Sequence, residues 1–104
     1  MAYPSKYENA QVEILGVPST ARQLTAGSAS SNTALTSTTQ RISMRANGAD
    51  IRFSIGTGTQ TANGNTSNFI ANGERLDFAV PVGANIAVIR DGTVNGTLEL
   101  TELI

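Results

Sequence analysis

Catalytic chemistry in this chain would have to come from carboxylates, because the sequence contains neither histidine nor cysteine. Paired Asp and Glu side chains are the acid and base of glycoside hydrolases, and the candidate pairs are Glu74 with Asp77 and Asp77 with Glu99. Glu74, however, precedes an alternating strand pattern, and Asp77 falls on the polar face of that pattern. Both side chains are therefore interpreted as solvated strand residues. We expect no enzymatic activity, and a glycan hydrolase is the least supported class.

Metal and cofactor chemistry is equally poorly represented. The eight Asp and Glu residues are scattered singly rather than gathered in the Asp-rich loops that bind calcium. The segment Gly56-Thr57-Gly58 begins like a phosphate-binding loop, but Thr61 occupies the place of the third glycine and no helical pattern follows. The sequence predicts neither a metal nor a cofactor.

Charged side chains offer binding chemistry instead. Seven Lys and Arg residues against eight Asp and Glu give a net charge of -1, which disfavours nucleic acid as a partner. Arginine outnumbers lysine six to one, and arginine suits directed bidentate contacts at interfaces. We expect partner binding at Arg41, Arg45 and Arg52, whose spacing places all three on one polar strand face. This face either contacts acidic groups of a partner or is exposed to solvent.

The elements that position these residues are predicted to be strands. Only 14% of the residues are charged, against about 25% in ordinary domains, and Ser, Thr, Asn and Gly replace them. Threonine favours strands, Asn-Gly favours turns, and helix-forming residues are sparse. At 104 residues the chain has room for one hydrophobic core.

The clearest element is a predicted hairpin. Residues 40–46 alternate, with Ile42 and Met44 on one face, and residues 51–55 alternate in the same way. Asn47-Gly48 between them is the strongest short hairpin signal. This hairpin would carry Arg41, Arg45 and Arg52 together on its outer face.

Further strands are predicted along the rest of the chain. They occupy residues 11–16 (closed by Pro18), 20–26, 69–71, 74–80 (ended by Pro81), 85–90 and 97–102. Residues 27–39 are expected to be a loop or irregular edge, and residues 56–68 a contact loop. Residues 85–90 are apolar on both faces, which indicates a strand covered on both sides or lying in an interface. The three phenylalanines, Phe53, Phe69 and Phe78, are expected in the core.

The fold prediction is a single antiparallel β-sandwich, with a jelly roll among its possible topologies. This domain spans residues 11–104 and follows an N-terminal arm at residues 1–10. The arm contains Tyr3 and Tyr7, which either dock on a neighbouring subunit or are exposed at a frayed terminus. No apolar leader and no run of about 18 apolar residues occurs, so we expect a protein made in a cytoplasm and not inserted in a membrane.

Several segments also resemble small virion structural proteins of tailed bacteriophages. The resemblance covers the C-terminal two-thirds of the chain: a hairpin with basic residues at 41–53, a polar loop, a turn of the Phe-Ile-Ala-x-Gly-Glu-x-Leu kind and a strand of the Ile-Ala-Val-Ile-Arg kind. Gly73, Glu74 and Leu76 match the turn, and residues 86–90 match the strand. The first 40 residues match less well.

What the resemblance implies is a capsid decoration, or cement, protein. Such a protein would bind the outer surface of the head and stabilise contacts between capsid subunits, with the major capsid protein or other virion proteins as partners. Because one small core is thinly stable, we also expect a homo-oligomer, preferably a trimer. A tail, fibre or baseplate component, or a carbohydrate-binding β-sandwich module, is the alternative; the lack of tryptophan argues against the module.

Overall fold

The computed structural model describes residues 16–104, and this part of the chain is built from strands without helices. The eight strands are β1 (Pro18–Ala26), β2 (Ser31–Ala34), β3 (Arg41–Asn47), β4 (Ile51–Thr57), β5 (Asn68–Ile70), β6 (Arg75–Ala79), β7 (Ala84–Arg90) and β8 (Gly96–Leu103). The predicted arm at residues 1–10, with Tyr3 and Tyr7, lies outside the described residues. So does all but the last residue of the strand predicted at 11–16.

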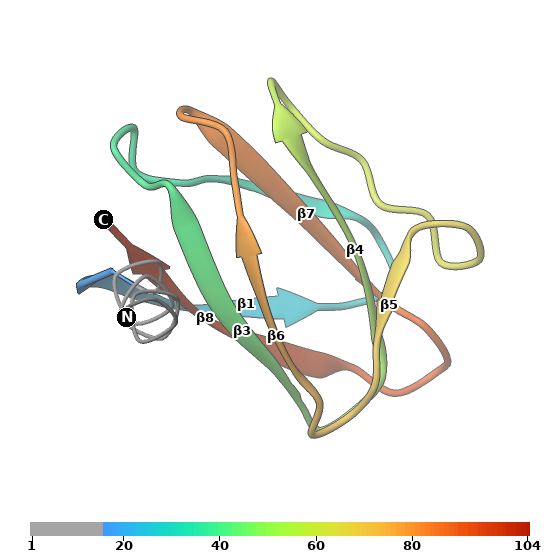
Figure 1. Cartoon of the computed structure of the whole chain (residues 1–104). Coiled ribbons are helices and arrows are strands. Elements are labelled where there is room, and N and C mark those ends of the chain that lie inside the picture. Colours follow the sequence, from blue (N-terminus) through green and yellow to red (C-terminus); the bar gives the residue numbers. More distant parts are fainter. Residues whose placement is uncertain (1–15) are drawn as a thin grey trace, which may run out of the picture.

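The strands form two antiparallel sheets of four strands that pack face to face (Figure 1). Sheet A has the order β1-β8-β3-β6, and sheet B has the order β2-β7-β4-β5. Except for the β4–β5 connection, every connection carries the chain from one sheet to the other. The predicted all-β sandwich is confirmed, and its strand order is that of a jelly roll.

The hydrophobic core lies between the sheets because each strand turns alternate side chains inward. Sheet A contributes Ile42, Met44, Leu98 and Leu100, while sheet B contributes residues that include Ile86; all of these are almost completely buried. The outward side chains of sheet A are largely polar, as the period-two pattern of β3 and β8 predicts. The core thus fixes which side chains each sheet presents to the outside.

The predicted hairpin of residues 40–55 is wrong. β3 pairs with β6 and β8 in sheet A, whereas β4 pairs with β5 and β7 in sheet B. The Asn47-Gly48 turn is present, with Gly48 at a φ of 95°, but it carries the chain across the sandwich. The reason is the burial of apolar side chains. In a hairpin, Ile42 and Phe53 would lie on the same face of one sheet. In this fold they lie on opposite sides of the core, where each helps to cover the other sheet.

Several predicted boundaries are also corrected. Pro18 is the first residue of β1, so this strand begins before the predicted residue 20, in keeping with the tolerance of a strand's first residue for proline. Residues 27–39, predicted to be a loop or irregular edge, contain the short edge strand β2, which pairs with β7. The predicted loop at 56–68 begins later, because β4 continues to Thr57.

The loop between β4 and β5 lies over the outer face of sheet B. Ala87 of β7 stands in register between Asn32 of β2 and Ser54 of β4. Gln60 Oε1 accepts a hydrogen bond from Ser54 Oγ, and the Gln60 backbone amide donates to Asn32 Oδ1, both at 2.9 Å. Gln60 therefore bridges over Ala87, which is fully buried. The expectation that β7 is covered on both sides is confirmed, and the cover is supplied by this chain.

Candidate interaction surface

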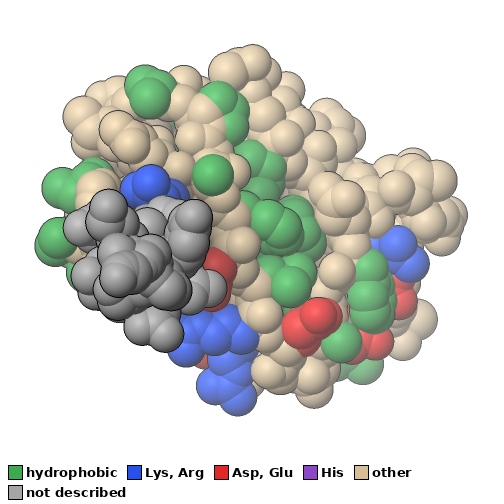
Figure 2. All heavy atoms as spheres, viewed as in Figure 1, with side chains coloured by type: hydrophobic (Ala, Val, Ile, Leu, Met, Phe, Trp, Pro, Cys, Tyr) green, Lys and Arg blue, Asp and Glu red, His purple; other side chains and the backbone are tan. Residues whose placement is uncertain are grey.

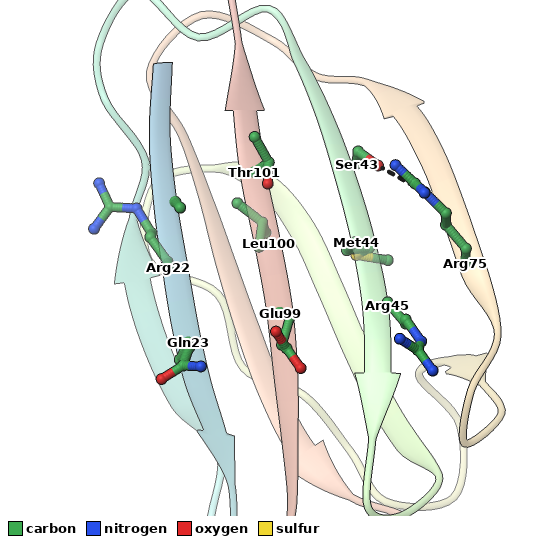
Figure 3. A pocket seen from close by; sticks show the side chains of 10 residues that line it. Arg22, Gln23, Ser43, Met44, Arg45, Arg75, Glu99, Leu100 and Thr101 are labelled. Carbon is green, nitrogen blue, oxygen red and sulfur yellow. Dashed lines mark hydrogen bonds between the residues drawn. The ribbon is translucent and has the colours of Figure 1, made fainter. Parts of the chain in front are cut away.

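The outer face of sheet A is the broadest polar surface that the strands build. Register pairing aligns one row of side chains across all four strands, and Figure 3 shows these side chains on adjacent strands. The row consists of Gln23, Glu99, Arg45 and Arg75. A second row, one step along the strands, consists of Ala21, Thr101, Ser43 and Asp77. All of these residues except Asp77 line a shallow hollow of about 570 Å³.

Few contacts restrain the arginines of this face. Arg75 Nε donates to Ser43 Oγ at 3.2 Å, the hydrogen bond dashed in Figure 3. Within residues 16–104 the ion pairs are Arg22 with Glu102 and Arg52 with Asp91, so Arg41, Arg45 and Arg75 have no acidic partner among the described side chains. Their guanidinium groups can therefore bind carboxylates of another molecule in bidentate fashion.

The prediction that Arg41, Arg45 and Arg52 share one face is wrong. Arg41 and Arg45 project from β3 on sheet A, but Arg52 projects from β4 on the outside of sheet B. The cause is the missing hairpin, since strands in different sheets cannot share an outer face. Whether any of the three binds a partner stays a prediction.

Arg52 is engaged within the chain. Its Nε lies 2.8 Å from Asp91 Oδ1, and its Nη1 donates to the Ser67 carbonyl at 3.0 Å. Its guanidinium also lies 4.9 Å from the centre of the Phe69 ring, a cation–π contact. These contacts hold the end of the β4–β5 loop against sheet B.

Arg75 is the arginine that replaces Arg52 on the polar face. The sequence carries a signal for it, because Arg75 stands one position before Leu76 in an alternating pattern and must point opposite to Leu76. Its position beside Arg45 depends on the pairing of β6 with β3, which is a long-range contact. The sequence could therefore predict that Arg75 faces outward, but it could not predict which residues lie beside it.

The side chain of Glu102 is buried inside the sandwich. It accepts hydrogen bonds from the Thr39 hydroxyl, from Arg22 Nε and, at 2.9 Å, from the Thr36 amide. Burial alone would raise the pKa of the Glu102 carboxyl, but the hydrogen bonds from Thr39, Arg22 and Thr36 outweigh burial and hold the pKa below its usual value. This carboxylate ties the β2–β3 loop and β1 to β8, and we interpret it as structural.

The carboxylates considered as catalytic pairs occupy ordinary positions. Glu74 Oε1 accepts a hydrogen bond from the Ala71 amide at 2.9 Å and closes the turn around Gly73. Asp77 and Glu99 lie on the open outer face of sheet A, where Glu99 accepts a hydrogen bond from Asn47 Nδ2 at 3.1 Å. Within residues 16–104, no group of three or more acidic side chains is placed to hold a metal ion.

An apolar groove lies at the edge of the sandwich, between β6 of sheet A and β4 and β5 of sheet B. Its volume is about 420 Å³. It is lined by Phe53, Ile55, Asn68, Phe69, Leu76, Phe78, Ala79 and Pro81. Figure 2 shows hydrophobic side chains gathered at this opening, with basic side chains on the sheet A side. Phe53 is in the core as predicted, but Phe69 and Phe78 are 43% and 38% exposed, which corrects the prediction for both.

No family model, curated protein or solved structure matches this chain. Within the described residues, no helix is long and apolar enough to cross a membrane.

Proposed function

We propose that this chain is a virion structural protein of a tailed bacteriophage, acting as a capsid decoration protein. In this role it binds the head surface through the outer face of sheet A and stabilises contacts between capsid subunits. The sequence resemblance suggests the class. The observation that carries the binding mode is the set of three arginines on sheet A that have no acidic partner within residues 16–104. The proposed localisation is the capsid surface.

The proposed partner surface is acidic and belongs to the major capsid protein or another virion protein. Arg45 and Arg75 stand directly opposite each other across β3 and β6, and like charges in this position repel one another. A carboxylate placed between them would relieve the repulsion and accept hydrogen bonds from both guanidinium groups. Binding by this face requires no catalytic residue, and we propose that the protein is not an enzyme.

The test is to change Arg41, Arg45 and Arg75 together to Gln and to measure binding to particles from which this protein has been removed. We expect binding to weaken about 100-fold, with a smaller salt dependence, since charged hot-spot contacts are lost. Arg90→Gln is the control, because Arg90 lies at the end of β7 in sheet B and hydrogen-bonds Asn95. Unchanged binding and salt dependence of the triple variant would contradict the proposal, as would selective binding of the purified chain on a glycan array.

A further inference from the structure

The free edge of β6 borders the apolar groove. β6 is the last strand of sheet A, and no described strand pairs with its outer side. The Val80 amide donates to the Gln40 carbonyl at 2.8 Å, so the even-numbered residues of β6 turn their backbone groups toward β3. The backbone amides and carbonyls that face away from β3 belong to Arg75, Asp77 and Ala79. An open edge beside exposed apolar side chains is a template for an added strand.

The two sides of such an added strand would meet different surroundings. On its inner side lies the groove, where Leu76 and Phe78 of β6 point. On its outer side lies the face of sheet A, where Arg75 stands beside Arg45. The matching strand therefore has two apolar residues separated by one acidic residue.

Residues 11–15, which lie outside the described part of the chain, have this pattern in sequence: Val12 and Ile14 flank Glu13. We propose that residues 11–15 of a second copy of this chain add to the free edge of β6. Val12 and Ile14 cover the groove, and Glu13 pairs with Arg75 on β6, so that Arg41 and Arg45 remain available to the capsid partner.

The reach of the chain excludes its own β6 as the acceptor. Gly16 directly precedes the Val17 amide that bonds the Ile104 carbonyl, at the β1 side of sheet A. A strand added to β6 lies four strand spacings from β1, about 19 Å away. Ile14 is two residues from Gly16 and reaches about 7 Å. Residues 11–15 can therefore reach this edge of β6 only in a neighbouring copy.

The contact is heterologous, since the arm of one copy meets the edge of the next. A heterologous contact closes into a ring when its rotation permits, and a ring of three copies would be the trimer proposed from the sequence. β7 takes no part in this contact, because the β4–β5 loop of the same chain covers Ala87.

The test uses two full-length variants. The arm variant carries Val12→Asp and Ile14→Asp, and the edge variant carries Asp77→Pro, which removes an amide that β3 does not use. By light scattering at tens of micromolar we expect the wild type to be oligomeric and each variant to be monomeric, with self-association at least about 100-fold weaker. Val94→Asp, which changes an exposed valine in the β7–β8 turn, is the control and is expected to stay oligomeric.

Mixing the variants sharpens the test. The arm variant retains an intact edge and the edge variant retains an intact arm, so the mixture is expected to associate again. Since the chain has no cysteine, Glu13→Cys in one copy and Arg75→Cys in another are expected to form a disulfide on oxidation, while Thr25→Cys on β1 is not. A monomeric wild type, an oligomeric arm variant or an absent disulfide would each overturn the proposal. These measurements use the purified chain alone, so their outcome is independent of attachment to a phage particle.

Discussion

On sheet B the chain covers its own strands, whereas on sheet A it leaves the strands exposed at Gln23, Arg45 and Arg75. Both faces belong to four-stranded antiparallel sheets around one core. The difference is made by the β4–β5 loop, in which Gln60 spans from β4 to β2 above the buried Ala87. Outward polar side chains therefore stabilise the fold on sheet B, whereas on sheet A they remain available to a partner.

The largest expected effect comes from a matched pair of alanines, one on each outer face. Ala87→Gln forces a long polar side chain under Gln60 and is expected to lower the free energy of unfolding by about 3 kcal/mol. Ala21→Gln, on the exposed face of β1, is expected to change it by less than about 0.5 kcal/mol. Urea unfolding followed by circular dichroism measures both. Equal effects would show that the loop does not close sheet B.

A second pair contrasts the two sides of β8. Glu102→Gln replaces the buried carboxylate and is expected to lower the free energy of unfolding by about 2 kcal/mol at pH 7, since Arg22 loses its ion pair. Glu99→Gln, on the exposed side of the same strand, serves as the control and is expected to be nearly neutral.

The Glu102 pair also predicts a pH dependence. The folded pKa of Glu102 lies below the 4.5 of a free glutamate, so the unfolded chain binds more protons near that pH. The stabilisation is therefore complete above about pH 4.5 and is lost as the pH falls through the lower, folded pKa. In Glu102→Gln this loss should be absent, and a variant with the same acid profile as the wild type would refute the assignment.

A smaller effect is expected where β4 passes under the loop. A Cβ added at Gly56 would lie 2.8 Å from Gln60 Nε2, so Gly56→Ala should displace the bridging side chain and cost about 1 kcal/mol. In a Gln60→Ala background the clash is gone, and the same substitution should become neutral or stabilising because glycine is unfavourable in a strand. If the effects of Gly56→Ala and Gln60→Ala on the free energy of unfolding simply added, the cost of Gly56→Ala would not come from its contact with Gln60.

The smallest effect on stability is expected from deleting residues 2–9, which contain Tyr3 and Tyr7. The melting temperature should change by less than about 2 °C, because these residues precede the domain predicted at residues 11–104. Attachment to particles should weaken, while self-association through residues 11–15 should persist. A deletion that unfolds the domain would make this segment part of the core, and one that binds normally would make it a passive tail.

The local pattern predicted most of the strands, because inward and outward alternation survives in any sheet arrangement. The pattern could not predict which strands pair with one another. Asn47-Gly48 favours a turn in either case, and only the burial of Ile42 against the opposite sheet decides that this turn joins two sheets. The prediction that Arg41, Arg45 and Arg52 share one face was wrong for the same reason, since β4 lies in the other sheet and places Arg52 on the opposite side of the molecule.

Glu102 shows a signal that was present but missed. The alternation of β8 places it on the same side as Leu98 and Leu100, so its burial follows from period two alone. Its partners could not be predicted, since Arg22 and Thr39 are distant in sequence and meet it only after the sheet is assembled. The loop cover of sheet B was hidden similarly, because the segment around Gln60 has no periodic pattern.

The position of β8 between β1 and β3 has a consequence for how the chain folds. β1 is the first described strand to leave the ribosome, yet its partner in sheet A is the last one synthesised. During translation, the edge of β1 and the inner side of β3 must therefore wait unpaired. Because such long-range pairing is slow and leaves strand edges exposed, folding of sheet A is expected to finish only after translation has passed Leu103. A chain stalled before β8 should be a protease-sensitive intermediate.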